Sequence, residues 1–461
     1  MIVKAIMVPH PPIALAEVGR GEERKMQDTL DAFRTASAEV RDAAPETIIV
    51  LSPHAVMYRD YFNISSGSKA YGDMGRFRAS HVAFEKNYDT EFTSELTRLL
   101  RKNDFPGGTE HDREKELDHG TMVPLYFLDQ CYTDYRLVRI GLSGLPLPMH
   151  YELGQYIART AEKLNRRIAV IASGDLAHCQ KEDGPYGYRP EGPAYDERIM
   201  KTMGTCRFEE LFAYEPSFLD KSMECGHRSF VILAGILDGL SVKAHVLSHE
   251  APFGVGYGII TYDIEGTDKK NRYLQQYEQT QKEKLAESAE KSDIYVKLAR
   301  EAAAYAVRHN RTMPMPDDLP AELLERRAGC FVSVHEHGDL RGCIGTIAPV
   351  RDSLAREIIE NAYSAVLRDP RFAPVMEKEL PWLEINVDIL EEPERISDRS
   401  ELDVKKYGII VSAHGRRGVL LPDLDGVDSV EEQIGIACSK GRIDPDDEDL
   451  VIERFEVTRH V

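Results

Sequence analysis

The 461-residue sequence lacks the features that mark several classes of protein. Its seven cysteines are an odd number without any Cys-x-x-Cys pair, which argues against a disulfide framework and a zinc ribbon. No apolar run approaches the roughly 18 residues needed to span a bilayer, and the first residues are typical of a strand, not of a basic leader. Excess positive charge is missing too, because 78 acidic residues outnumber 58 basic ones and leave a formal net charge of −20. These absences predict a cytoplasmic protein with reduced thiols that binds neither nucleic acid nor membranes.

What the sequence does contain is a series of short apolar runs that end in polar turns, separated by amphipathic segments. Over residues 1–266 this pattern predicts an α/β domain with a central, largely parallel or mixed sheet flanked by helices. Residues 267–291 are dense in Gln, Glu and Lys and predict a charged helical linker. Residues 292–461 do not repeat the strand–helix–strand order and predict an α+β domain.

The expected elements can be given by residue range. In the first domain we expect strands over 3–8, 47–51, 136–142, 168–172, 244–248 and 256–264, and helices over 22–43, 90–102, 123–128, 149–164, 194–203 and 228–240. In the second domain we expect a helix over 293–308, strands over 330–334 and 385–390, a helix over 354–366, and a hairpin formed by 408–413 and 418–421.

Histidines lie close behind three of the expected strands. His10, His54 and His178 each come just after an apolar run, and His119 lies at the start of an expected helix. Ligands bind at the carboxyl ends of strands in open α/β sheets, because the loops there gather side chains from several strands. A single histidine at such a place is more often a capping or loop residue than a ligand, but four together favour a shared site.

The sequence also offers a carboxylate for a metal site. Two imidazoles and one carboxylate on one face of iron(II) leave three neighbouring positions open, enough for a substrate and dioxygen. We assign His10 and His54 as the imidazoles and Glu224 as the carboxylate, because Glu224 lies at an expected helix start. Cys225 is the alternative metal ligand, and Glu224 has a second interpretation as a charge stabilised by the helix dipole.

The remaining two histidines, His178 and His119, are candidates to act on a bound substrate. An imidazole titrates near pH ~6.5, so that His178 is a candidate to move protons, and His119 is a candidate to hydrogen-bond the substrate.

These segments carry a resemblance to a known family. It rests on five motifs, Val8-Pro9-His10-Pro11-Pro12, Leu51-Ser52-Pro53-His54, Asp118-His119-Gly120-Thr121, Ser173-Gly174-Asp175-Leu176-Ala177-His178 and Glu224-Cys225-Gly226-His227-Arg228-Ser229. Taken together and in order, over roughly residues 1–265, they resemble the LigB-like class III extradiol dioxygenases and the Memo proteins that share their fold.

The resemblance implies an activity and a set of roles. It implies that His10, His54 and Glu224 hold iron(II), and that a catechol-like aromatic binds through both oxygens beside dioxygen. It further implies that His178 acts as acid and base while His119 contacts the substrate or the oxygen. Memo-like proteins are similar to this sequence in carrying a cysteine where Cys225 stands, and a sulfur facing the metal would favour zinc or copper(I).

The second domain contains one stretch of interest, Leu340-Arg341-Gly342-Cys343-Ile344-Gly345. Its glycines permit a bulge or a close approach to the backbone, and Cys343 beside Arg341 is a candidate stabilised thiolate. The simpler alternative is packing, because free cysteine is among the most buried residue types. Together with 325–333, 368–372 and 406–408, the stretch closely resembles the AMMECR family over residues 292–461.

The fusion of these two domains is similar to that in the AmmeMemoRadiSam systems, whose third component is a radical SAM enzyme. Two functions follow as hypotheses. In the first, the chain is a metal-dependent oxygenase that acts on a catechol-like ring, with the second domain presenting substrate or a partner. In the second, it is a metal-binding accessory protein of a radical SAM enzyme, without dioxygenase activity. The sequence has no Cys-x-x-x-Cys-x-x-Cys, so an iron–sulfur partner would be a separate chain, and a homo-oligomer is left open.

Overall fold

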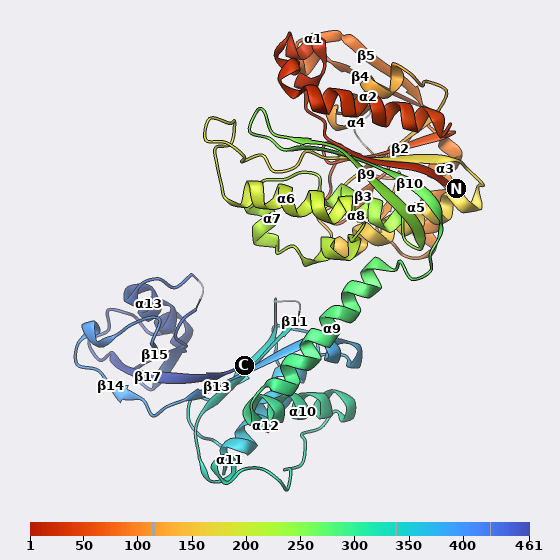
Figure 1. The fold of residues 1–461 in the computed structure, drawn as a ribbon. Helices are drawn as coiled ribbons and strands as arrows, with labels where there is room; N and C mark the ends of the chain where they lie inside the picture. Colours follow the sequence, from red (N-terminus) through yellow and green to blue (C-terminus); the bar gives the residue numbers. More distant parts are fainter. Residues whose placement is uncertain (113–115, 337–338, 425) are drawn as a thin grey trace. The chain divides into compact units, whose positions relative to one another are not determined.

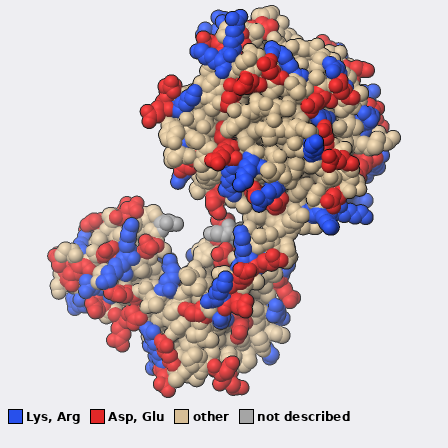
Figure 2. Space-filling model, in the orientation of Figure 1, with Lys and Arg blue, Asp and Glu red and all other residues tan. Residues whose placement is uncertain are grey.

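The computed structural model describes residues 1–112, 116–336, 339–424 and 426–461. The chain divides into two compact units, Met1–Glu278 and Gln279–Val461. The boundary lies inside helix α9 (Tyr273–Lys291), in the segment expected to be a charged linker. In the described ranges, no helix combines the length and the apolar character that crossing a bilayer requires. Figure 2 shows acidic and basic side chains interspersed over the visible face of each unit.

The first unit is built on a six-stranded mixed sheet with the strand order β7-β2-β8-β1-β10-β9. The first four strands in this order are parallel, and β10 and β9 continue the sheet antiparallel. The strands are β1 (Ile2–Val8), β2 (Thr47–Ser52), β7 (Arg136–Gly141), β8 (Ile168–Ser173), β9 (Leu240–Glu250) and β10 (Tyr257–Thr267). Two small ribbons are formed by β3 (Phe62–Asn63) with β6 (Gly107–Gly108) and by β4 (Lys69–Met74) with β5 (Ala79–Asn87).

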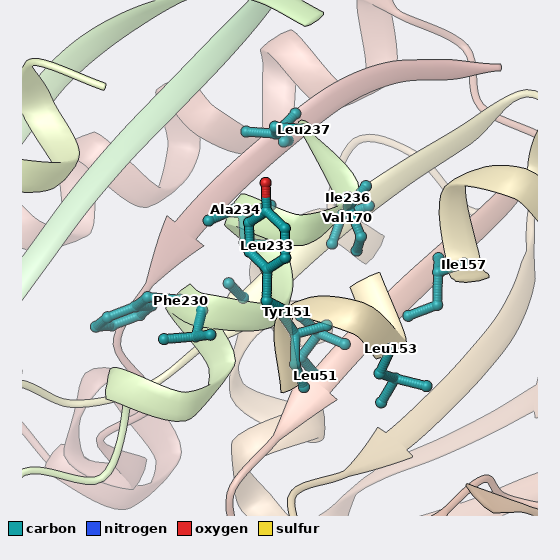
Figure 3. Packing of buried hydrophobic residues seen from close by; sticks show 14 of the residues in the cluster. Leu51, Tyr151, Leu153, Ile157, Val170, Phe230, Leu233, Ala234, Ile236 and Leu237 are labelled. Carbon is teal, nitrogen blue, oxygen red and sulfur yellow. The ribbon is translucent and has the colours of Figure 1, made fainter. Parts of the chain in front are cut away.

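Helices cover both faces of this sheet (Figure 1). They are α1 (Ala16–Gly19), α2 (Gln27–Asp42), α3 (Thr90–Lys102), α4 (His119–Asp129), α5 (Leu147–Lys163), α6 (Glu191–Gly204), α7 (Pro216–Ser222) and α8 (His227–Ile236). Successive strand residues point to opposite faces, so each strand contributes side chains to two hydrophobic cores. Ile49 and Leu51 of β2 join one cluster with α3, α5 and α8, whereas Ile48 and Val50 join the other with α2 and α4. Figure 3 shows the first of these cores, where α5 and α8 meet Leu51 and Val170.

The second unit is an antiparallel sheet with helices packed against it. The strand order is β12-β11-β13-β17-β15-β16, and β14 pairs with β17. The strands are β11 (Cys330–Glu336), β12 (Asp339–Gly345), β13 (Leu383–Leu390), β14 (Glu394–Arg395), β15 (Tyr407–Ala413), β16 (Arg416–Leu420) and β17 (Val451–His460). The helices are α10 (Ile294–His309), α11 (Ala321–Glu325), α12 (Leu354–Leu367) and α13 (Val430–Gly441). Helices α10 and α12 pack on β11 to β13, and α13 packs on β15 and β16.

The predicted fold classes, α/β followed by α+β, are confirmed. In the first unit α5 and α6 differ from the expected bounds by one to three residues, α8 ends at Ile236 instead of residue 240, and α2 and α4 differ most at their starts. Helix α2 begins at Gln27, because Glu22–Met26 form a 3-10 turn. Helix α4 begins at His119, four residues earlier than expected, because the Asp118 side chain accepts a hydrogen bond from the backbone N–H of Thr121 and caps the helix.

Candidate metal centre

The carboxyl ends of three adjacent parallel strands place the candidate residues. Strand β8 lies between β2 and β1, and its last residue, Ser173, is in register with Val8 of β1. His10 follows β1 by two residues, and His54 follows β2 by two residues. Parallel strands end at the same edge of a sheet, so the loops after β1, β2 and β8 meet there.

His10 is buried, and its ring is held in one tautomer. Its Nδ1 lies 2.9 Å from the hydroxyl oxygen of Ser173. That hydroxyl donates its own hydrogen to the carbonyl oxygen of Gly120 at 2.6 Å, so it accepts from His10 and Nδ1 carries the proton. The lone pair of His10 therefore lies on Nε2, which faces the other imidazoles. Metal-binding histidines are typically oriented by such a hydrogen bond on the second nitrogen.

His54 and His119 complete a group of three imidazoles around this lone pair. The Nε2 atoms of His10 and His54 are 3.0 Å apart, and the rings of His54 and His119 are stacked with centroids 4.1 Å apart. One ring nitrogen from each of the three histidines lies within 4.8 Å of the others. Gly120 leaves room for this arrangement, because a Cβ atom there would lie 2.5 Å from the Ser52 hydroxyl and 3.4 Å from the His54 ring.

Burial keeps these imidazoles neutral. Desolvation is the largest cause that lowers the pKa of His10 well below 6.5, and the neighbouring imidazoles of His54, His119 and His178 lower it further. Burial also lowers the pKa of His54, and it lowers the pKa of His119 to about 4. Neutral imidazole is the form that can bind a metal ion, and the lowered pKa values keep these three rings in that form at neutral pH.

His178 approaches the same cluster from the loop after β8. Burial lowers the pKa of His178 to about 4, and the neighbouring imidazole of His54 lowers it further. Its Nε2 atom is buried and has no hydrogen-bond partner among the described residues. The ring of Tyr186, an exposed residue of the loop that follows, lies 5.3 Å from the His178 ring. The Nε2 atom of this neutral imidazole is therefore available for a hydrogen bond or a proton transfer to a bound molecule.

Glu224 and Cys225 lie differently relative to the cluster. The Glu224 carboxylate accepts a hydrogen bond of 2.6 Å from the backbone N–H of His227, at the first residue of α8. Desolvation raises the pKa of Glu224 to about 7. The sulfur of Cys225 lies 3.6 Å from Nε2 of His10. The structure therefore brings His10, His54 and His119 together, gives Glu224 a backbone partner, and leaves its metal role a prediction.

Asp175 is a site residue that the sequence analysis did not select. Its carboxylate accepts a hydrogen bond of 2.7 Å from the backbone N–H of His10, and its second oxygen lies 4.0 Å from Nε2 of that ring. Burial raises the pKa of Asp175 to about 7. A signal was present in the sequence, because Asp175 directly follows Ser173-Gly174 in the turn that ends β8.

A cavity of about 200 Å³ opens beside His54 and His119. Its other lining residues are Asp73, Arg76, Phe77, Glu116, Leu117, Asp118 and Met122. The Phe77 ring lies edge-on to His119 with centroids 5.4 Å apart. Drug-sized ligands usually occupy at least roughly 300 Å³, so this cavity suits a smaller molecule such as one containing a single ring.

The candidate residues of the second unit, Arg341 and Cys343, have different hydrogen-bond partners. The Arg341 guanidinium donates to the Glu379 carboxylate at 2.8 Å and to the carbonyl oxygen of Ala373 at 2.8 Å. Cys343 instead accepts a hydrogen bond of 3.2 Å from the Ser333 hydroxyl. Arg371, not selected as a site residue from sequence, donates to the Cys343 carbonyl oxygen at 3.0 Å.

The donor set of the first unit fits a divalent transition-metal ion. Two imidazole nitrogens that share an ion at about 2.1 Å lie no more than twice that distance apart, and the 3.0 Å between His10 and His54 satisfies this limit. The fixed tautomer of His10 turns its lone pair toward the shared position. Neutral nitrogen donors suit iron, zinc and copper better than magnesium or calcium.

Fold and site together define a class: an α/β domain with an imidazole cluster at the carboxyl edge of its sheet, joined to an α+β domain. The family described as the catalytic LigB subunit of aromatic ring-opening dioxygenase matches residues 4–260, so the chain belongs to the LigB family. The AMMECR1 family matches residues 296–460, and the chain carries this domain at its C-terminal end. The predicted two-domain architecture is therefore confirmed.

Relatives match either the whole chain or about a third of it. Protein CA_C1420 of Clostridium acetobutylicum is 40% identical over 462 residues, which is 98% of either chain. A Thermotoga maritima protein is 49% identical over 167 residues, 36% of this chain and 96% of its own.

Two solved structures are also similar. Uncharacterized protein PH0010 of Pyrococcus horikoshii covers 36% of this chain and 89% of its own, with 31% identity and a TM-score of 0.34. Uncharacterized protein JW3007 of Escherichia coli K12 covers 56% and 99%, with 14% identity and a TM-score of 0.37.

Proposed function

We propose that the first unit is a metal-dependent oxygenase that opens a catechol-like aromatic ring with dioxygen. The observation that carries the proposal is the convergence of three neutral imidazoles from three separate segments, beside a cavity of about 200 Å³. Membership of the LigB family supports the reaction class.

His10 and His54 are the paired metal ligands in this proposal. Of the candidates for the third donor, His119 is the one whose ring nitrogen lies within 4.8 Å of both. Glu224 is the alternative third donor, and it would exchange its hydrogen bond to the His227 N–H for the metal. Iron(II), when bound, supplies a centre on which a catechol and dioxygen meet in neighbouring positions.

The other residues bind the ring and move protons. The cavity beside His54 and His119 receives the aromatic ring, and Phe77 forms part of its wall. His178 accepts a catechol proton at Nε2, the buried nitrogen without a partner among the described residues. A neutral imidazole is required for this step, and the lowered pKa of His178, about 4, keeps it neutral.

Oxygen uptake by the iron-loaded protein tests the proposal. The protein is loaded anaerobically with iron(II), mixed with a panel of catechols, and exposed to oxygen while the ring-opened product is followed by absorbance. We expect uptake with at least one catechol, and we expect His10→Ala to lose both iron and uptake. His81→Ala is the matched control, because His81 is an exposed histidine of β5. Full iron occupancy without uptake on any catechol would reject the dioxygenase.

One observation favours a second candidate function. The Cys225 sulfur lies 3.6 Å from Nε2 of His10, where it offers a soft donor that suits zinc or copper(I). The chain would then be a metal-binding accessory protein of a radical SAM enzyme. This candidate predicts a preference for zinc or copper(I) over iron(II) that Cys225→Ser removes, together with no oxygen uptake in either protein.

A further inference from the structure

One face of the second unit's sheet carries a group of polar side chains around a thiol. Along β11, Cys330, Val332 and Val334 are buried, whereas the residues between them are half-exposed. Helix α12 packs on β11 and β12, so the buried residues mark its side. Cys343 pairs with Ser333 across the strands and lies on the opposite, more open face.

Two arginines belong to the same group. In β17, Arg459 pairs with Asp388, and Asp388 pairs with Phe331, the residue two before Ser333 in β11. Arg371 comes from the segment after α12 and donates to the Cys343 carbonyl oxygen at 3.0 Å. The pKa of each arginine is raised, first by its carboxylate partner, and Cys343 contributes to both shifts. The hydrogen bond to the Cys343 carbonyl places Arg371 beside this residue, and the strand register places Arg459 on the same face of the sheet.

A buried carboxylate orients each guanidinium through two hydrogen bonds. Arg371 donates to Asp369 through Nε and NH2 at 3.0 and 2.7 Å. Arg459 donates to Asp388 in the same way at 2.8 and 3.1 Å. Both carboxylate side chains are 2% exposed, whereas the arginine side chains are 54% and 46% exposed. Within the described residues, the NH1 group of each arginine has no hydrogen-bond partner. Its N–H groups are therefore available to a molecule that binds from solvent.

We propose that this face is a second binding site, which takes a small molecule through a carboxylate or phosphate group. Arg371 and Arg459 hold the oxyanion, and the Cys343 thiol, with the Ser333 hydroxyl on its sulfur, faces the bound molecule. Rigid guanidinium groups with free N–H donors match the geometry of such oxyanions. Arg341 is not part of this site, because its guanidinium is bound to Glu379 and to backbone carbonyls. The site is independent of the oxygenase proposed for the first unit.

Alkylation of the intact protein tests the site with a defined probe. Iodoacetate and iodoacetamide react alike: the thiolate sulfur bonds to the CH2 carbon, the C–I bond breaks, iodide leaves, and the thiol proton passes to solvent. Only iodoacetate carries a carboxylate. For each cysteine, peptide mass spectrometry gives the ratio of the iodoacetate rate to the iodoacetamide rate. We expect this rate ratio to be roughly tenfold higher at Cys343 than at Cys131, the exposed cysteine of the same chain.

Competition and substitution identify the residues. Acetate and inorganic phosphate, added separately, should slow iodoacetate at Cys343 and leave iodoacetamide unchanged, and the stronger competitor shows which oxyanion the site prefers. Arg459→Gln and Arg371→Gln should lower the rate ratio to that of Cys131, while Arg459→Lys should retain part of it. Arg395→Gln, at an exposed arginine of β14, is the matched control and should change nothing. Equal rate ratios at Cys343 and Cys131 in the unmodified chain would overturn the proposal, whatever the variants' stability.

Discussion

At the residue scale, the metal site proposed for the imidazole cluster depends on the position of one proton. The Ser173 hydroxyl fixes this proton on Nδ1 of His10 and leaves Nε2 as the donor. We predict that Ser173→Ala lowers metal affinity about 10- to 100-fold, as losses of such orienting partners typically do. Isothermal titration with zinc or anaerobic iron(II) measures the change. Ser80→Ala, at an exposed serine of β5, should bind as the unchanged protein does; equal affinity in Ser173→Ala would show that the hydroxyl does not set the tautomer.

A buried histidine outside the cluster predicts how the first unit responds to acid. Burial lowers the pKa of His150 from 6.5 to about 4, and its ring is hydrogen-bonded to the Pro146 carbonyl and the Ser143 N–H. Between these pH values the unfolded chain binds the proton and the folded protein does not. The free energy of unfolding is therefore unaffected by this group above pH 6.5 and falls as the pH drops toward 4, by about 3 kcal/mol.

Replacement of His150 tests this dependence. His150→Gln keeps a donor and an acceptor without titrating, so the loss of unfolding free energy between pH 6.5 and 4.5 should be smaller than in the unchanged protein. Urea unfolding at several pH values measures it. The same substitution at exposed His81 should leave the pH profile unchanged, and parallel profiles for all three proteins would refute the assignment.

At the scale of elements, the candidate metal centre depends on a close contact between the end of β8 and the start of α8. A Cβ atom at Gly174 would lie 2.1 Å from the Cα of Gly226, too close for the backbones to stay in place. We predict that Gly174→Ala separates the two elements, costs roughly 1–3 kcal/mol of unfolding free energy and weakens metal binding. A Cβ atom at Gly435 in α13 would have no other atom within 4 Å, so Gly435→Ala should instead stabilise its unit by roughly 0.5–1 kcal/mol. Chemical unfolding of both variants measures the contrast; equal effects would contradict it.

Apolar periodicity predicted most elements of the first unit, because its strands are buried on both faces and its helices are amphipathic. Helix α3 has the expected bounds, and β1, β2 and β7 differ by one residue at one end. Prediction was weaker in the second unit, where no element was expected over 430–460. Helix α13 and strand β17 lie there, and β17 has few fully buried residues to form a pattern.

Strand order also determined how much of the candidate site was predictable. His10 and His54 follow β1 and β2, the parallel strands on either side of β8, so their convergence at one edge of the sheet could be inferred from the sequence alone. The second interpretation of Glu224, a charge stabilised by the dipole of the following helix, agrees with the hydrogen bond that its carboxylate accepts from the His227 backbone N–H at the start of α8. The sequence did not predict that Arg371 contacts Cys343, because Arg371 lies in a segment far from Cys343 along the chain.

At the scale of the whole molecule, two compact units joined through α9 should respond separately to a metal that binds the first. The single tryptophan, Trp382, lies in the second unit, so its fluorescence reports that unit alone, while calorimetry detects both. Zinc or anaerobic iron(II) at 100 times its dissociation constant adds about 2.7 kcal/mol to the unit that binds it. We predict that the calorimetric transition of the first unit rises by roughly 5 °C or more while the tryptophan transition stays in place. His10→Ala should abolish the shift, and a metal-dependent tryptophan transition would show that the two units unfold as one.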